Sequence, residues 1–276
     1  YTPTGCLDGV TQSTFGAWSP TACARCVWHD RPEVCSDAKN QAWAKKRELL
    51  VDLISLDCGP AIDFNASPKA FRGPLTAALD PAFWHPDLEP PAHLRRPRTR
   101  DDEVIVYHGV GNHATRTRDG VNVKGTHAVV AAIDALRAEG IPIRLDFVHD
   151  VPSIDNRFVQ VQADIIVDQL NHGRYGATAR EGMMLGKPVV ARINPWDGDG
   201  VPATQCILET PVVNADERTI KDVLRDLALD PAKRTAIGRA SREHALKWCA
   251  ASELAKRFER VYESVRETGR PPRGFE

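Results

Sequence analysis

The chain has 276 residues, which is enough for one large domain or two small ones with a sizeable hydrophobic core. Its 36 basic residues are balanced by 37 acidic residues, which argues against a nucleic-acid-binding surface. No apolar run approaches the roughly 20 residues that cross a membrane as a helix. Because the chain opens on Tyr1 without a signal-peptide pattern, we expect a processed or truncated cytoplasmic product.

Four of the seven cysteines lie within the first 35 residues, a pattern that suits a reducing compartment and a metal better than disulfides. Cys23 and Cys26 have the spacing at which two thiolates bind one tetrahedral zinc ion from a tight turn. Cys6 and Cys35 would complete a site of four sulfur ligands, with His29 as a substitute. The alternative is a loop-rich segment with free thiols, and the sequence favours neither.

Residues 37–56 are predicted to form an amphipathic helix. Its apolar face would carry Trp43, Leu50, Leu53 and Ile54, opposite Lys45, Lys46 and Arg47. Residues 58–100 are rich in proline, so little regular structure is expected there. Within them, Trp84 would fill a gap in a surface linker. Residues 79–90 are also similar to a segment that joins the two domains of a known family, and both interpretations can hold. We place the domain boundary near residue 99, between regions 1–98 and 99–276.

A strand is predicted over residues 103–109, a β-branched run that ends at the turn Gly109-Val110-Gly111-Asn112. We interpret it as the first strand of a nucleotide-binding domain. The loop that follows carries Arg116 and Arg118. For each arginine taken singly, a solvated loop position is an equally good interpretation.

Lys124-Gly125 opens a predicted helix over residues 126–139. A strand over residues 141–148 comes next and ends at His149. This histidine is a candidate base, although a histidine at a strand end more often has a structural hydrogen-bonding role.

Ile165-Ile166-Val167 is too short an apolar run for a helix and predicts a buried strand. A polar loop leads to a predicted helix over residues 177–185, which Gly186 ends. The unpaired N–H groups of its first turn would face the loop and form an anion site. Glu181, one turn into the helix, could accept two hydroxyls of a sugar. The alternative is an ordinary βαβ unit with a solvated glutamate.

An irregular stretch follows Val190 and ends in the segment Asp197-Gly198-Asp199-Gly200, which we interpret as a surface turn rather than a metal-binding loop. Short strands are predicted at residues 207–208 and 211–213. A helix is predicted over residues 217–227, and a longer one from Pro231 to about residue 267. The long helix carries the aromatic residues Trp248, Phe258 and Tyr262.

Residues 163–190 resemble the donor-binding motif of the retaining, nucleotide-sugar-dependent glycosyltransferases with the GT-B fold, of the group 1 or family 4-like type. That motif consists of an apolar strand, a small-residue loop, two glutamates separated by seven residues, and a Gly-x-Pro-Val-Val ending. Glu181 matches the second glutamate, which in the family binds the ribose of the nucleotide. Gly173 stands in place of the first, which contacts the donor sugar or its phosphate. Asp168-Gln169-Leu170 replaces the usual apolar-Pro-Ser at the strand end.

The resemblance implies roles for further residues. Lys124, together with Arg116 or Arg118, would neutralise the donor diphosphate, and these three are the catalytic candidates. The residues expected to bind the nucleotide sugar are Gly111, Asn112, Tyr175, Gly176, Ala177, Thr178 and Glu181. A cysteine-rich insert of bacterial polysaccharide glycosyltransferases is similar to the segments Thr4-Gly5-Cys6, Asp37 and Trp43-Ala44-Lys45-Lys46.

We therefore expect an α/β fold of the GT-B type. A Rossmann-like donor domain over residues 99–276, with a C-terminal crossover helix, would follow part of an acceptor domain over residues 1–98. The implied function is transfer of a sugar from a nucleotide-diphosphate sugar to a carbohydrate or lipid-linked acceptor, with retention. In this family the departing diphosphate helps to deprotonate the acceptor, while cationic groups stabilise its charge.

Two other classes of function are alternatives. The first is a non-catalytic binding or regulatory protein, favoured by Gly173 in place of the first glutamate. The second is a zinc-organised nucleic-acid module, which the balanced charge argues against. The expected partners are a nucleotide sugar and an acceptor, with a possible structural zinc, no nucleic acid and at most peripheral membrane contact.

Overall fold

The fold is that of a computed structural model, which describes residues 1–2, 10–56, 67–75, 77–149, 151–197 and 201–272. Its contacts divide the chain into two units. The first unit comprises Tyr1–Ala78, Asn194–Glu209 and Trp248–Glu276, and the second comprises Leu79–Ile193 and Thr210–Lys247. Each unit has core residues of its own. The domain boundary placed near residue 99 stays a prediction.

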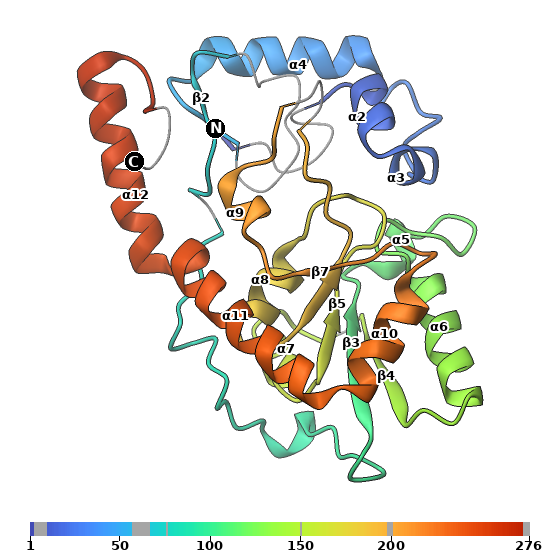
Figure 1. The fold of residues 1–276 in the computed structure, drawn as a ribbon. Helices are drawn as coiled ribbons and strands as arrows, with labels where there is room; N and C mark the ends of the chain where they lie inside the picture. Colours follow the sequence, from blue (N-terminus) through green and yellow to red (C-terminus); the bar gives the residue numbers. More distant parts are fainter. Residues whose placement is uncertain (3–9, 57–66, 76, 150, 198–200, 273–276) are drawn as a thin grey trace. The chain divides into compact units, whose positions relative to one another are not determined.

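The second unit is built on a five-stranded parallel sheet (Figure 1) with the order β4-β3-β5-β6-β7. Its strands are β3 (Val104–Gly109), β4 (Ile143–Val148), β5 (Ile165–Val167), β6 (Val189–Ala191) and β7 (Val213–Asn214). The predictions of strands at 103–109, 141–148 and Ile165–Val167 are confirmed. A parallel sheet with connecting helices is the α/β architecture that the sequence predicts.

Helices cover both faces of this sheet because side chains alternate along each strand. Val106 and Ile165 share one core with α6 (Thr126–Ala138) and α10 (Ile220–Leu229), which lie side by side. Ile166 points to the opposite face, where α8 (Ala177–Met184) packs closely. A Cβ at Gly182 of α8 would lie 2.6 Å from Ile166 Cδ1, so this approach requires glycine.

The remaining elements of the second unit are η2 (Ala92–Leu94), α5 (His113–Arg116), α7 (Asn156–Gln160) and the first part of α11 (Pro231–Cys249). The prediction of one helix from Pro231 to residue 267 is wrong at Ala250. There the backbone turns extended, with ψ 135°, before α12 (Ala251–Thr268) begins. The Arg257 side chain donates to the Trp248 carbonyl at 3.1 Å, so a side chain satisfies a carbonyl that the interrupted helix leaves unpaired.

The first unit contains α2 (Gln12–Trp18), α3 (Pro20–Ala24), α4 (Asp37–Leu50), α9 (Gln205–Leu208) and α12. Strands β1 (Ile54–Ser55) and β2 (Ala70–Phe71) form a parallel pair. Residues 207–208 were expected in a strand, and this is wrong. They end α9, a single helical turn that buries Cys206 and Ile207 next to each other.

The predicted apolar face of the helix over residues 37–56 is also wrong. The helix ends at Leu50, and Trp43 and Leu50 are 45% and 74% exposed. Its inner face instead carries Asn40, whose side chain donates to the Val10 carbonyl at 3.1 Å. Ala44 on the same face packs against Ile54 of β1. The inner face of the helix therefore carries a buried amide that donates to a backbone carbonyl, whereas the hydrophobic period predicts Trp43 on that face.

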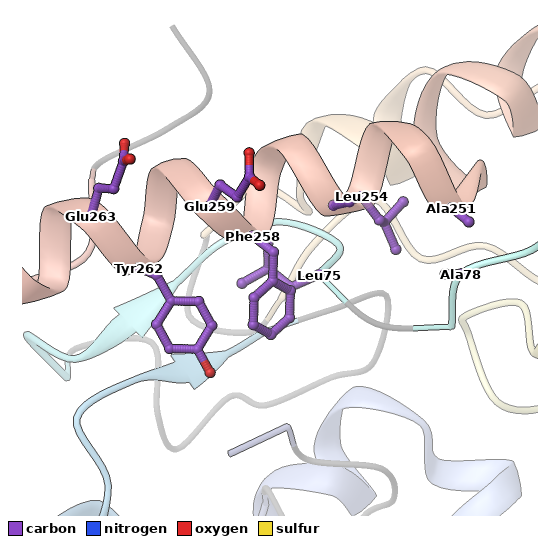
Figure 2. A pocket seen from close by; sticks show the side chains of 9 residues that line it. Leu75, Ala78, Ala251, Leu254, Phe258, Glu259, Tyr262 and Glu263 are labelled. Carbon is purple, nitrogen blue, oxygen red and sulfur yellow. The ribbon is translucent and has the colours of Figure 1, made fainter.

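A cavity of about 570 Å³ lies within the first unit, along α12. Figure 2 shows Phe258 and Tyr262 extending from α12 toward the side where Leu75 lies, with Glu259 and Glu263 on the other side of the helix. The two aromatic rings are 4.9 Å apart between centroids. None of the predicted binding residues lines this described cavity.

Among the described residues, no helix is both long and apolar enough to cross a membrane.

Candidate functional site

A second cavity, of about 350 Å³, lies within the second unit at the carboxyl ends of β3 and β5. In the order β4-β3-β5-β6-β7 the chain reverses its direction of winding between these two strands. In doubly wound parallel sheets, ligands bind in the crevice outside the carboxyl ends of the strands at such a reversal. The predicted residues Gly111, Arg116, Lys124, Gly176, Ala177, Thr178 and Glu181 all line this cavity.

Lys124 meets a buried carboxylate in the cavity wall. Its Nζ donates to Asp168 Oδ1 at 2.9 Å and to Thr178 Oγ1 at 3.1 Å. The Asp168 side chain is fully buried and that of Lys124 is 13% exposed. The other carboxylate oxygen, Asp168 Oδ2, accepts the backbone N–H of Gly176 at 2.5 Å. Asp168 therefore joins the lysine to the residue that precedes α8.

Two backbone features hold Lys124 beside the end of β5. Asn122 Oδ1 accepts the N–H groups of Lys124 at 3.1 Å and Thr126 at 3.3 Å, which closes the turn before α6. The Lys124 carbonyl accepts the Leu170 N–H at 3.3 Å, so the two segments run next to each other. Gly125 between them has φ +72°, and a Cβ there would lie 3.0 Å from Leu170 Cβ. The turn thus requires glycine directly after the lysine.

His108 connects β3, β5 and α6 beneath the cavity. The ring is fully buried, with Nδ1 3.0 Å from the Val167 carbonyl oxygen and Nε2 2.9 Å from Thr126 Oγ1. A carbonyl only accepts, so Nδ1 carries the proton and Nε2 accepts from the Thr126 hydroxyl. Burial and the charge of Lys124 lower the pKa of His108 to about 4. The ring is therefore neutral at pH 7 and acts as a structural connection.

Glu181 lies at the opposite wall, where Oε2 accepts the side-chain N–H of Gln160 at 2.8 Å. Burial raises the pKa of Glu181. Close by, the Tyr107 hydroxyl donates to Asn156 Oδ1 at 2.9 Å, and burial raises the pKa of Tyr107 to about 12. Two side chains of α7, Asn156 and Gln160, thus order the polar groups around Glu181.

Gly109 is required by this arrangement. A Cβ at this position would lie 2.2 Å from the Tyr107 hydroxyl oxygen and 2.8 Å from Cζ. The first glycine of the Gly109-Val110-Gly111 turn therefore makes room for Tyr107, while a Cβ at Gly111 would meet no atom within 4 Å.

The two candidate arginines are placed differently. Arg116, at the end of α5, is exposed and lines the cavity. Arg118 lies in a turn where its N–H and carbonyl pair with Val121, and its Nε is 3.7 Å from Asp119 Oδ2. Asn112 precedes α5 with φ 53°, and Tyr175 is 3% exposed. Neither Asn112 nor Tyr175 belongs to the described lining.

Asp168, Tyr107, Asn156 and Gln160 were not predicted as site residues. The sequence signal for Asp168 was its place directly after a buried strand, and in a parallel sheet such positions converge on one edge. Tyr107 and the α7 residues gave no such signal, because the first lies inside a hydrophobic strand and the others in a five-residue helix.

The predicted zinc ligands lie in the first unit, and Cys6 falls outside the described residues. Cys23 Sγ is 3.6 Å from His29 Nδ1, and Cys35 Sγ accepts the Asn40 side-chain N–H at 3.7 Å. Burial raises the pKa of both Cys23 and Cys35. Among the described residues, no group of three or more His, Cys, Asp and Glu side chains is placed to hold a metal. The four-cysteine zinc site is therefore not supported by the described part of the chain.

No protein-family model matches this chain, and no curated protein sequence matches it. Solved structures do. HepE of Anabaena, in complex with UDP and glucose, has a TM-score of 0.57 at 12% identity, over 84% of this chain and 68% of HepE. A glycosyltransferase from Rickettsia africae has a TM-score of 0.54 at 13% identity, over 78% of this chain and 64% of that one.

Sucrose-phosphate synthase from Thermosynechococcus elongatus has a TM-score of 0.52 at 16% identity, over 82% of this chain and 62% of the synthase. The match therefore spans 62% of the length of the synthase and 64% of the Rickettsia glycosyltransferase. HepE and the sucrose-phosphate synthase have the GT-B fold with Rossmann-like domains. At these identities the likeness defines the fold alone, and the chain has an α/β fold of the GT-B type.

Proposed function

We propose that this chain is a glycosyltransferase that moves a sugar from a nucleotide-diphosphate sugar to a carbohydrate or lipid-linked acceptor, with retention. One observation carries the proposal. Lys124, Arg116, Glu181 and the start of α8 line one cavity at the carboxyl edge of the sheet. Cations and helix N–H groups suit a diphosphate, and a carboxylate suits the hydroxyls of a ribose. The fold likeness adds that HepE, a structural neighbour, has been solved with UDP-glucose.

This arrangement supports a role for each residue of the cavity. Arg116 and the third N–H of the Lys124 ammonium group face the diphosphate, since two of the three N–H groups already bond Asp168 and Thr178. The N–H groups of Ala177 and Thr178, in the first turn of α8, add further donors. Glu181 binds the ribose. As the diphosphate leaves, these donors stabilise its growing negative charge, which is how the site would accelerate transfer.

The sugar end of the donor is bound differently from the resembled family. Gly173 has φ +85°, a left-handed conformation that a glutamate adopts only with strain. The loop is thus built for glycine, and another group must contact the donor sugar. His149, which lines the cavity after β4, is one such group.

A non-catalytic binding protein is the second candidate function. It is favoured by Gly173 and by the carboxylate of Asp168, which neutralises Lys124. Such a protein would bind the nucleotide sugar without turning it over.

Release of nucleoside diphosphate from a panel of nucleotide sugars, with and without oligosaccharide acceptors, separates the two candidates. The proposal predicts turnover that Arg116→Ala lowers more than Arg118→Ala, because Arg116 lines the cavity and Arg118 lies in the neighbouring turn. Binding without turnover across the panel would favour the non-catalytic function.

A further inference from the structure

The charged side chains along the described cavity balance each other. Its arginine and lysine cations are Arg116 and Lys124, and its carboxylates are Asp168 and Glu181. A site that binds a doubly or triply charged diphosphate would be expected to carry a surplus of positive charge, because like charges in a partly buried pocket repel. The surplus that Lys124 would provide is cancelled by Asp168 at 2.9 Å.

Asp168 is seated where an anionic ligand would be. Its two oxygens accept hydrogen bonds from one N–H of Lys124 and from the N–H of Gly176, the residue that precedes α8. A lysine beside a helix N-terminus is a standard binding arrangement for a phosphate oxygen. The carboxylate is fully buried, so water screens its charge little.

We propose that Asp168 is a specificity-determining residue that sets how much negative charge the cavity accepts. Its carboxylate occupies the N–H donors of Lys124 and Gly176. The site can therefore bind a diphosphate diester, but it binds a terminal phosphate less tightly. This inference rests on the proposed function, and it concerns the difference between donor and product.

That difference is one charge. The diphosphate of a nucleotide sugar is esterified at both ends and carries two negative charges. After transfer, the nucleoside diphosphate has a terminal phosphate whose second pKa is about 6, so it carries close to three at pH 7. A buried carboxylate near the β-phosphate therefore weakens binding of the product more than binding of the donor, and it favours product release.

The test compares wild type with Asp168→Asn, which keeps the shape of the side chain and removes its charge. Titration calorimetry measures binding of inorganic pyrophosphate, which carries terminal phosphates and needs no nucleotide site. We expect Asp168→Asn to bind pyrophosphate at least about tenfold more tightly than wild type, from the removal of one nearby charge. Asp134→Asn, which removes an exposed carboxylate on α6, is the matched control and should bind like wild type.

A second arm measures a nucleoside diphosphate against the corresponding nucleotide sugar. Asp168→Asn should tighten binding of the nucleoside diphosphate more than binding of the nucleotide sugar, and product inhibition should increase by a similar factor. A residue with a merely structural role would lower both affinities together.

Equal or weaker pyrophosphate binding by Asp168→Asn, or no binding by either protein, would overturn the proposal. If Asp168→Asn does not fold, Asp168→Ser removes the same charge with a smaller side chain, and the same ordering is required of it. If pyrophosphate responds as expected while no nucleotide binds either protein, the proposed function fails and the role of Asp168 in charge selection stands.

Discussion

Replacement of Lys124 by methionine is the most direct test of the buried pair in the cavity wall. Lys124→Met keeps an apolar stem of similar length but leaves the Asp168 carboxylate, which is fully buried, without its cation. Removing one partner of a buried ion pair typically costs about 3–5 kcal/mol. The Gly176 N–H still bonds Asp168 at 2.5 Å, so we expect the lower end, about 3 kcal/mol.

The double variant Lys124→Met/Asp168→Asn removes both charges, and it should recover most of this loss because no unpaired charge stays buried. Urea-induced unfolding at pH 7 measures both values. Lys221→Met is the matched control, since it breaks an ion pair with Glu139 in which both side chains are about 40% exposed. That variant should unfold close to wild type. A loss below about 1 kcal/mol for Lys124→Met, or no recovery in the double variant, would show that the buried charge of Asp168 does not need Lys124.

Three further predictions follow from the same cavity. Glu181→Gln should weaken binding of a ribose nucleotide more than binding of its 2'-deoxy form, because the deoxy form already lacks one charge-assisted bond. Equal losses of affinity for the two nucleotides, measured by calorimetry, would contradict ribose binding by Glu181. His108 binds a proton more readily when unfolded, since its folded pKa is about 4. His108 should therefore contribute a fall in stability of about 1.4 kcal/mol per pH unit between pH 6.5 and 4, and His108→Gln should reduce the measured slope by that amount in urea titrations. Gly109→Ala should cost about 1–3 kcal/mol, because its Cβ would lie 2.2 Å from the Tyr107 hydroxyl, whereas Gly111→Ala should fold like wild type.

The central strands β3 and β5 could be predicted from the sequence because they are short apolar runs that are buried on both faces of the sheet. Ile165–Val167 and Val104–Gly109 are buried throughout, and such runs between turn residues leave few other interpretations. The helix that begins at Asp37 could also be predicted, but its inner face and its end at Leu50 could not. Its inner face depends on a hydrogen bond from Asn40 to a carbonyl 30 residues away, which the hydrophobic period does not contain.

The candidate site also contains residues that could be predicted from the sequence and a contact that could not. Lys124, Arg116 and Glu181 could be assigned to one site because the resemblance to the GT-B family gives each of them a role toward the same donor, and all three line one cavity. The pairing of Lys124 with Asp168 joins residues 44 positions apart and arises from the segment beside Leu170. No local pattern encodes that contact, and it changes the charge that the site offers to a ligand.

We propose that this cavity binds the diphosphate and ribose of a nucleotide sugar. The most direct measurement is calorimetric titration of the protein with a panel of nucleoside diphosphates. We expect that at least one nucleoside diphosphate binds, that the corresponding nucleotide sugar competes with it, and that Arg116→Ala and Glu181→Gln both weaken its binding. At 100 times its dissociation constant, that ligand should stabilise the protein by ~2.7 kcal/mol. Absence of binding by every member of the panel at millimolar concentration, or wild-type affinity in both variants, would contradict nucleotide-sugar binding in this cavity.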